Sequence, residues 1–135
     1  MNIVILGCGR VGARLATILG RSHRVTIIDW NAGAFDRLGP DFAGDTVVGN
    51  GIDVEVLRSV ATGDADLFLA LTDGDNRNLF AAQVARRLGA RRIIARVYDA
   101  ERSGIFSQMG FTAISPTVNS ARRLFNMVVG QREAQ

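Results

Sequence analysis

A glycine-rich hexapeptide near the N-terminus has the residue types and spacing to bind phosphate. It reads Gly7-Cys8-Gly9-Arg10-Val11-Gly12, which fits the pattern G-x-G-x-x-G, and it follows an apolar run and precedes helically spaced apolar residues. In that setting the first glycine permits a tight turn, the second lets a pyrophosphate approach the backbone, and the third lets helix and strand pack closely. The N-terminus of the helix offers free N–H groups to a phosphate. Surface turn glycines are the alternative explanation when the pattern is considered alone.

A single carboxylate follows the second apolar run at the position that suits a ribose. Asp29 ends the run Arg24 to Asp29, and Trp30 comes next. A carboxylate there accepts hydrogen bonds from both ribose hydroxyls and repels a 2′-phosphate. The sequence therefore favours NAD(H), or AMP, ADP or ATP, over NADP(H). The alternative role for Asp29 is to cap a helix that begins near Asn31.

Further candidates follow the other apolar runs, where a parallel sheet would place them along the same ligand crevice. They are Asn50, Gly51, Ile52, Thr72, Asp73 and Arg96. Asn50 could recognise the adenine edge while Ile52 packs on the face of the ring. Arg10 and Arg96 could meet phosphate oxygens from two sides, although surface ion pairs would also explain both arginines.

The elements that must position these residues alternate along the chain. Strands are expected over residues 2–6, 24–29, 46–48, 66–71, 92–97 and 112–114, with helical patterns between them. The strands are apolar along most of their length, which predicts a parallel sheet covered on both faces. We therefore expect an α/β, three-layer Rossmann fold whose six-stranded parallel sheet has the order 3-2-1-4-5-6.

Length and composition predict one domain over residues 1–135, of which 47% are apolar and 21% charged. No apolar run reaches the roughly 18 residues of a membrane span, and the N-terminal residues do not resemble an export signal, so a cytoplasmic domain is expected. All 16 basic residues are arginines, scattered without the interleaved aromatics of a nucleic-acid surface. The one cysteine and one histidine cannot form a typical metal site, so no metal is expected. A small residue in a tight turn explains Cys8 better than a reactive thiol does.

The last helical pattern bears on assembly. After Pro116 the apolar residues recur at i, i+3, i+4, i+7 and i+8, namely Ala121, Leu124, Phe125, Val128 and Val129. A terminal helix needs only one apolar face to cover its own sheet, and Phe125, Met127 and Val129 exceed that need, which predicts a two-fold homodimer that buries this surface. Packing of the stripe into the domain's own core is the alternative.

Together these motifs resemble one known family, the TrkA-N domain, also called the RCK or KTN domain. The resemblance runs over essentially the whole chain. It rests on the hexapeptide at residues 7–12 and on Ile27-Ile28-Asp29, Val48-Gly49-Asn50-Gly51, Leu71-Thr72-Asp73, Asn78-Leu79, Ile94-Ala95-Arg96-Val97-Tyr98-Asp99 and Ile114-Ser115-Pro116.

The resemblance implies a regulatory domain without catalytic residues. Such domains assemble, as dimers or rings, on the cytosolic side of potassium channels and transporters, whose membrane subunit they gate by exchanging nucleotides. It also implies phosphate roles for Arg10 and Arg96, a ribose role for Asp29 and an adenine role for Asn50-Gly51. Asn78 would lie near the nucleotide, or would cap a local loop instead.

Three differences from the family pattern stand out. Many relatives have an acidic residue in place of Asn50, and several have a glutamate that binds a cation in place of Thr117. Full-length relatives also have a smaller C-terminal lobe, so a truncated chain or a separate lobe is expected.

A small NAD-dependent oxidoreductase, or an NAD(H) redox sensor, is the alternative function. The sequence offers little for catalysis. The only histidine, His23, lies in the turn before the second strand, away from the ligand crevice. Tyr98 is followed four positions later by Arg102, so the Tyr-x-x-x-Lys pair of short-chain dehydrogenases is not present. A sensor that controls transcription would need a helix-turn-helix, and no such segment is evident.

Overall fold

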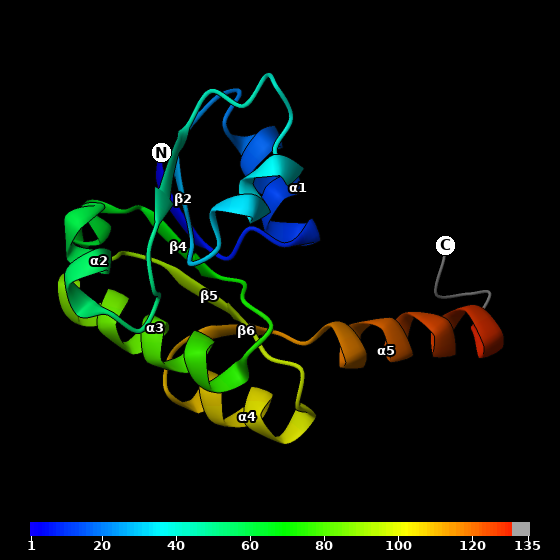
Figure 1. The fold of residues 1–135 in the computed structure, drawn as a ribbon. Helices are drawn as coiled ribbons and strands as arrows, with labels where there is room; N and C mark the ends of the chain where they lie inside the picture. Colours follow the sequence, from blue (N-terminus) through cyan, green and yellow to red (C-terminus); the bar gives the residue numbers. More distant parts are fainter. Residues whose placement is uncertain (131–135) are drawn as a thin grey trace.

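A six-stranded parallel sheet forms the centre of the structure, a computed structural model that describes residues 1–130 (Figure 1). Its order is β3-β2-β1-β4-β5-β6, which confirms the predicted topology. The strands are β1 Asn2–Leu6, β2 Arg24–Asp29, β3 Asp45–Val48, β4 Leu67–Ala70, β5 Ile93–Arg96 and β6 Thr112–Ile114. In the centre of the sheet Ile5 pairs with Ile27 of β2 and with Leu69 of β4. All three side chains are buried, because helices cover the middle of the sheet on both faces.

Helices cover the two faces unequally (Figure 1). Helix α1 (Arg10–Leu19) and the 3₁₀-helix η1 (Ala32–Arg37) pack on one face, where their alanines join the isoleucines of β1 and β2. Helices α2 (Val54–Ser59), α3 (Asp75–Leu88) and α4 (Ala100–Gln108) pack on the other, around Phe68 and Phe106. A short 3₁₀-helix, η2 (Thr62–Asp64), connects α2 to β4.

The segment after β2 is helical, as expected, but its cap is not Asp29. It forms six residues of 3₁₀-helix, and its cap is Asn31, whose side chain accepts a hydrogen bond from the Gly33 N–H at 3.0 Å. The alternative role of Asp29 as the cap of this helix is therefore wrong. The Asp29 carboxylate remains available to the loops at the end of the sheet.

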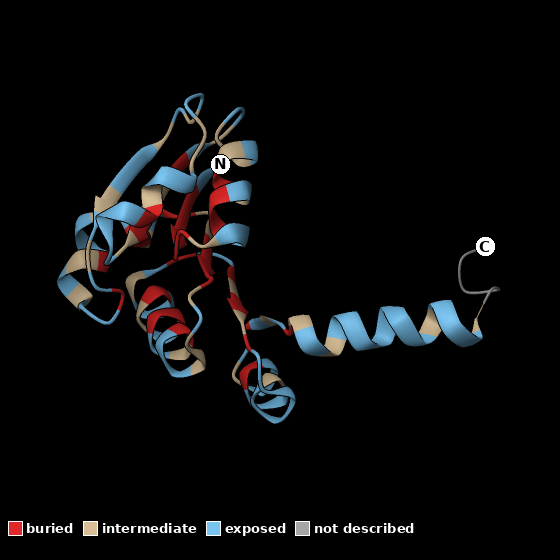
Figure 2. Cartoon of the chain, turned by 45° about the vertical axis from the view of Figure 1, so that its right-hand side comes forward, coloured by how far each residue is buried: buried red, intermediate tan, exposed pale blue. Residues whose placement is uncertain are grey.

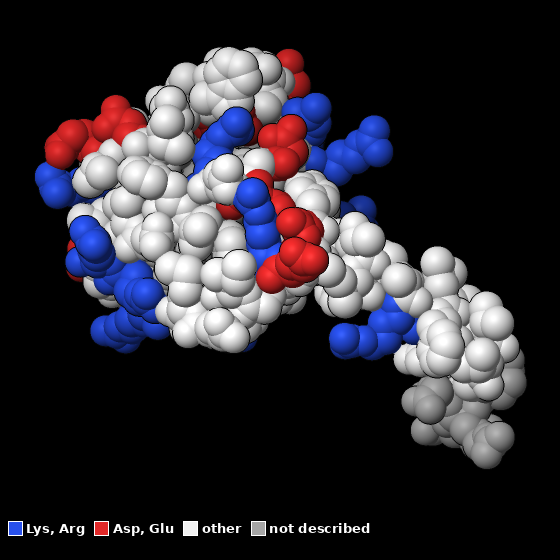
Figure 3. Space-filling model, turned by 90° about the horizontal axis from the view of Figure 1, so that it is seen from below, with Lys and Arg blue, Asp and Glu red and all other residues white. Residues whose placement is uncertain are grey.

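Helix α5 (Pro116–Val129) extends away from the body of the domain (Figures 1 and 2). Its N-terminus is well defined, because the Ser115 hydroxyl accepts a hydrogen bond from the Val118 N–H and Pro116 occupies the first turn. None of its residues is buried, and Phe125 is 62% exposed. Figure 3 shows the helix clear of the body, with few charged side chains on the side in view. Packing of the apolar stripe into the domain's own core is therefore wrong.

Across residues 1–130, no helix combines the length and the apolar character that crossing a membrane requires.

Candidate functional site

Two adjoining cavities lie at the carboxyl ends of the central strands. Their volumes are about 310 Å³ and about 300 Å³. Both are lined by Gly7, Asp29, Trp30, Thr72 and Arg77. The first cavity is also lined by residues 49–52 after β3, and the second is also lined by Cys8, Gly9, Asp73 and Arg96. We call the two together the crevice.

The three glycines of the hexapeptide have different structural requirements. Gly7 has φ +108°, and a Cβ there would lie 2.9 Å from the backbone of Leu71. A Cβ on Gly12 would lie 1.9 Å from the Gly7 carbonyl oxygen, so α1 approaches β1 only because this residue lacks a side chain. A Cβ on Gly9 would meet nothing within 4 Å. The fold therefore needs Gly7 and Gly12, whereas Gly9 leaves open space at the rim of the crevice.

The first turn of α1 presents unpaired backbone donors beside this open space. The first hydrogen bond of the helix runs from the Ala13 N–H to the Gly9 carbonyl at 2.9 Å. Within residues 1–130, no acceptor is found for the N–H groups of Gly9, Arg10, Val11 and Gly12. Free N–H groups at the positive end of a helix dipole suit a phosphate.

Asp29 lies between the end of β2 and the glycine turn. Its Oδ2 accepts a hydrogen bond from the Cys8 N–H at 2.8 Å, and its Oδ1 accepts one from the Asn31 N–H at 2.9 Å. Each carboxylate oxygen has a further lone pair, so the group can accept two more hydrogen bonds. A ribose diol at the mouth of the crevice would satisfy them.

Residues on the β3 side give the crevice apolar surface and a polar edge. Trp30 is 71% exposed and Ile52 50% exposed, and both line the first cavity. The Asn50 Oδ1 accepts from the Ile52 N–H at 3.1 Å, which leaves the side-chain amide donors of Asn50 for a ligand. Gly51 is buried, and a Cβ there would lie 2.5 Å from Leu6 Cδ2. This arrangement suits a flat base with hydrogen-bonding groups on its edge.

Asn78 does not line the crevice but joins the strand ends beneath it. It is fully buried and donates to the carbonyl oxygens of Thr72 and Arg96 at 2.9 and 2.8 Å. Its Oδ1 accepts from the Thr72 N–H at 3.0 Å and from the Thr72 hydroxyl at 2.6 Å. This network fixes the loop after β4 to the end of β5.

Arg96 lines the second cavity and holds the same strand ends. Its Nη2 donates to the carbonyl oxygens of Leu71 and Thr72 at 2.5 and 3.1 Å, and its guanidinium lies over the Tyr98 ring. Its Nε is buried and lacks an acceptor among the described residues.

Three residues from the hexapeptide lie outside the crevice, and one of them is Gly12, whose role is to let α1 pack against the glycine turn. Arg10 lines a separate groove between α1 and η1, so the structure does not bring Arg10 and Arg96 into one cavity. Val11 is 47% exposed on α1 and lines neither cavity.

Two arginines at the crevice were not predicted from the sequence. Arg77 lines both cavities and pairs with Asp73 at 3.8 Å. It lies in the first turns of α3, and helices that follow a parallel strand begin at this edge, which could have identified it. Arg37 donates from Nη1 to the Cys8 carbonyl at 3.3 Å, and no spacing in the sequence indicated that contact.

Cys8 fills the glycine turn as a buried small residue, as expected. Its thiol contacts the Ala34 carbonyl oxygen at 3.4 Å. Burial raises the pKa of the Cys8 thiol, and the nearby Asp29 carboxylate raises it further, while Arg37 partly opposes this. The alternative of a reactive, low-pKa thiol is therefore wrong.

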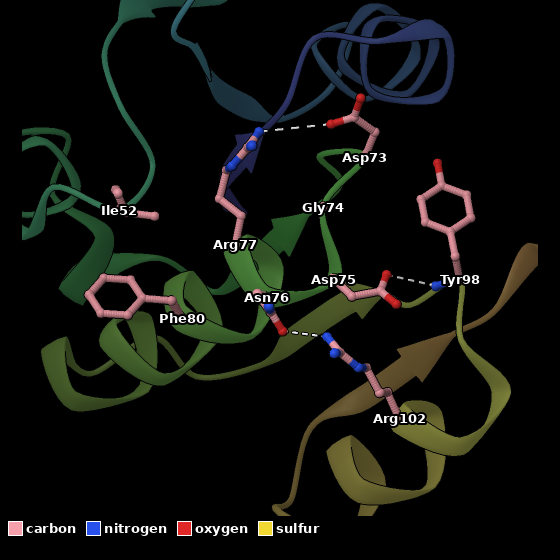
Figure 4. A pocket seen from close by; sticks show the side chains of 9 residues that line it. All are labelled: Ile52, Asp73, Gly74, Asp75, Asn76, Arg77, Phe80, Tyr98 and Arg102. Carbon is pink, nitrogen blue, oxygen red and sulfur yellow. Dashed lines mark hydrogen bonds and ion pairs between the residues drawn. The ribbon is translucent and has the colours of Figure 1, made fainter.

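A wider hollow of about 630 Å³ adjoins the crevice at the N-terminus of α3 (Figure 4). It shares Ile52, Asp73 and Arg77 with the crevice. Asp75 accepts hydrogen bonds from the N–H groups of Tyr98 and Asp99 at 2.8 and 3.1 Å. The Tyr98 ring and the Arg102 guanidinium do not point toward each other, because Arg102 donates to Asn76. Within the described residues no cluster of three or more potential metal ligands occurs.

The sheet order, the glycine turn and the crevice define a Rossmann-fold domain of the nucleotide-binding type. Residues 3–116 match the family model of the TrkA-N domain, and the chain belongs to that family.

Curated relatives are potassium uptake proteins. The chain is 42% identical over 124 residues to the Trk system potassium uptake protein TrkA of Streptomyces coelicolor, which covers 90% of this chain and 54% of the relative. It is 31% identical over 136 residues to a TrkA homolog of Methanothermobacter thermautotrophicus, covering 99% and 63%. The chain thus spans about half to two thirds of these proteins.

Solved structures share the fold at low sequence identity. The TrkA-N domain of the inner membrane protein ybaL from Escherichia coli superposes with a TM-score of 0.82 at 19% identity, covering 93% of this chain and 95% of that one. The AMP-bound Kef C-terminal domain of Shewanella denitrificans gives 0.77 at 19%, covering 99% and 85%. The GsuK channel bound to NAD gives 0.71 at 23%, covering 85% and 21%.

Proposed function

We propose that this domain is the nucleotide-sensing part of a potassium uptake system and that it binds NAD(H) or an adenine mononucleotide in the crevice. The observation that carries the proposal is the open space at Gly9, at the start of α1, where the N–H groups of residues 9–12 have no acceptor among the described residues and where the neighbouring Cys8 N–H binds the Asp29 carboxylate. A phosphate and a ribose diol are complementary to these two features. Related structures bound to AMP, NAD and ADP support the ligand class, and the TrkA relatives support the transport role.

The ligand would connect elements that the protein alone joins only by loops. Asp29 ends β2, the free donors begin α1, and Arg96 ends β5. A nucleotide that contacts all three favours the relative positions in which it fits, and its binding energy can stabilise one state of an assembly. In this proposal the coupled partner is the membrane subunit of a potassium channel or transporter, with the domain on its cytoplasmic side.

Sensing is favoured over oxidoreductase chemistry by the position of His23. This histidine lies in the turn before β2, at the opposite end of the sheet from the crevice, and its Nδ1 lies 3.1 Å from the N-terminal nitrogen. It cannot reach a nicotinamide held at the strand ends. General acid–base catalysis needs a group within hydrogen-bond distance of the substrate.

The proposal includes a homodimer formed through α5. The exposed residues Leu124, Phe125 and Val128 occupy one side of a helix that extends from the body. Burying each such side chain contributes about 1.5–3 kcal/mol, so a symmetric contact of two helices would be favourable.

A thermal-unfolding series tests ligand binding. Melting temperatures would be measured with AMP, ADP, ATP, NAD⁺, NADH and NADPH, because a ligand that binds only the folded state raises the melting temperature with concentration. We expect a rise with at least one ligand that has a free 2′-hydroxyl, and little or none with NADPH. No shift with any of them, or chemical turnover of any of them, would overturn the proposal.

The transport role is tested in cells. Potassium-limited growth or rubidium uptake would be measured in a strain that lacks the full-length gene and is complemented by wild-type or crevice-variant protein. Equal uptake with and without the gene would contradict the transport role, but it would not contradict the proposed nucleotide binding.

A further inference from the structure

A groove lined by four arginines runs between α1 and η1, outside the crevice. Its volume is about 760 Å³. Six of its lining residues matter here: Arg10, Arg14, Ile18, Arg21, Arg37 and Thr17. We call it the arginine groove. It lies in the layer that contains α1 and η1.

The positive charge of the groove is not neutralised by ion pairs among the described residues. Helix α1 contains no acidic residue, and within residues 1–130 none of these four arginines has a carboxylate within ion-pair distance. Arg10, Arg14 and Arg21 also make no side-chain hydrogen bond to the described residues, whereas Arg37 is held by the Cys8 carbonyl. Four like charges that converge without counterions create a local positive potential that attracts anions.

The spacing of the arginines suits more than one phosphate. Arg10 and Arg14 lie one helical turn apart, about 6 Å along the axis of α1, and Arg21 follows in the turn after the end of the helix. Guanidinium groups bind phosphate through paired N–H donors, and they retain their charge at any physiological pH. A single phosphate could contact only part of this row.

The uncharged residues of the groove argue against nucleic acid. No aromatic residue lines it, so bases would have no ring on which to stack. Ile18 is 46% exposed among the arginines, and an apolar side chain beside cations is typical of surfaces that meet lipid headgroups.

We propose that the arginine groove binds clustered phosphate groups, the chemistry shared by free oligophosphates and by the headgroups of anionic phospholipids. This site is distinct from the crevice and does not require a nucleotide there. Arg37 lines both spaces, so a ligand in the groove would lie next to the glycine turn without displacing a nucleotide.

The experiment uses two probes and two charge-matched variants of the protein. Binding of tripolyphosphate would be measured by calorimetry. Binding to lipid would be measured by co-sedimentation with vesicles of phosphatidylcholine that contain about 30% phosphatidylglycerol, an anionic content that attracts basic surfaces. Vesicles of pure phosphatidylcholine are the control. The test variant is Arg14→Gln with Arg21→Gln, and the control is Arg87→Gln with Arg92→Gln. All four residues are exposed, and neither variant changes a residue that lines the crevice.

We expect wild type and control to bind at least one probe at low salt, and the test variant to bind it at least about tenfold more weakly, the loss expected when charge-assisted phosphate contacts are removed. Binding of tripolyphosphate alone identifies a free phosphate ligand, and binding of anionic vesicles alone identifies lipid. Equal weakening in both variants would show that only net charge matters, and it would overturn the proposal. Absence of wild-type binding to both probes would overturn it as well. Nucleotide-induced thermal stabilisation, measured in the same variants, reports on the crevice separately.

Discussion

The Asp29 carboxylate accepts a hydrogen bond from the backbone N–H of Cys8 at 2.8 Å, and this contact ties the end of β2 to the glycine turn. The group expected to hold a ribose and the loop expected to hold a phosphate therefore form one unit. Their separation is fixed before any ligand arrives, which lowers the entropy cost of binding.

Replacing Asp29 should weaken nucleotide binding far more than it weakens the fold. Asp29→Ala removes the acceptor for two backbone N–H groups and costs about 1–3 kcal/mol, less than the roughly 5–15 kcal/mol of a typical domain. Loss of the contacts to the ribose should raise the Kd of every adenosine ligand by about 10- to 100-fold. Calorimetric titration measures the Kd, and Asp36→Ala on η1 is the control. Unchanged affinity in Asp29→Ala would contradict a ribose in this position.

Substitutions of Gly9 and Gly12 should affect different properties, nucleotide affinity in the first case and stability in the second. Gly9→Ala should fold normally, because its Cβ meets nothing within 4 Å, yet bind nucleotides more weakly because the methyl group occupies the phosphate approach. Gly12→Ala should be destabilised by about 3 kcal/mol or more, since its Cβ would lie 1.9 Å from the Gly7 oxygen. Melting temperature and nucleotide titration distinguish the two effects. Gly104→Ala, in open space on α4, serves as the control for binding: it should keep full nucleotide affinity, and stability should rise by about 0.5–1 kcal/mol because alanine favours the helix interior. Full nucleotide affinity in a folded Gly9→Ala protein would exclude this approach path.

The Cys8 thiol should be unreactive in the native protein and should make stability depend on alkaline pH. Burial raises its pKa, so the folded protein keeps the thiol protonated to higher pH than the unfolded chain, where the pKa is about 8.5. The resulting stabilisation is fully present below that pH and is lost as pH rises through the folded pKa. Urea unfolding at several pH values between 7 and 10 should therefore show a stability difference between wild type and Cys8→Ala that shrinks with pH. A constant difference would contradict this assignment, as would rapid labelling of the folded protein by a disulfide reagent.

Helix α5 should determine the oligomeric state. Wild type should sediment as a dimer at concentrations on the order of tens of micromolar, the range in which modest apolar interfaces associate. Phe125→Asp should shift it to monomer, because a charge would have to be buried in the contact. Ile105→Asp is the matched control, since Ile105 is 53% exposed on α4 and Phe125 is 62% exposed. A monomeric wild-type protein at these concentrations would argue against the dimer.

The sequence by itself determined the sheet order and the glycine turn. Both depend on local patterns: apolar runs that form buried strands, and glycines at positions where the chain turns or packs closely. Asp29 could be placed beside the turn for the same reason, because β1 and β2 are neighbours in a doubly wound sheet and their carboxyl ends meet. Most of the crevice was therefore predictable from short-range features.

Only the tertiary structure decided which arginines meet at which surface. Long side chains reach several ångströms from the backbone in different directions, so spacing along the chain does not reveal that Arg77 and Arg37 approach the glycine turn while Arg10 faces the groove. The apolar stripe of α5 likewise does not reveal whether the helix packs in the domain's own core or in an interface, because either arrangement would bury the same side chains. Its placement depends on the turn at Ser115, which directs the helix away from the sheet.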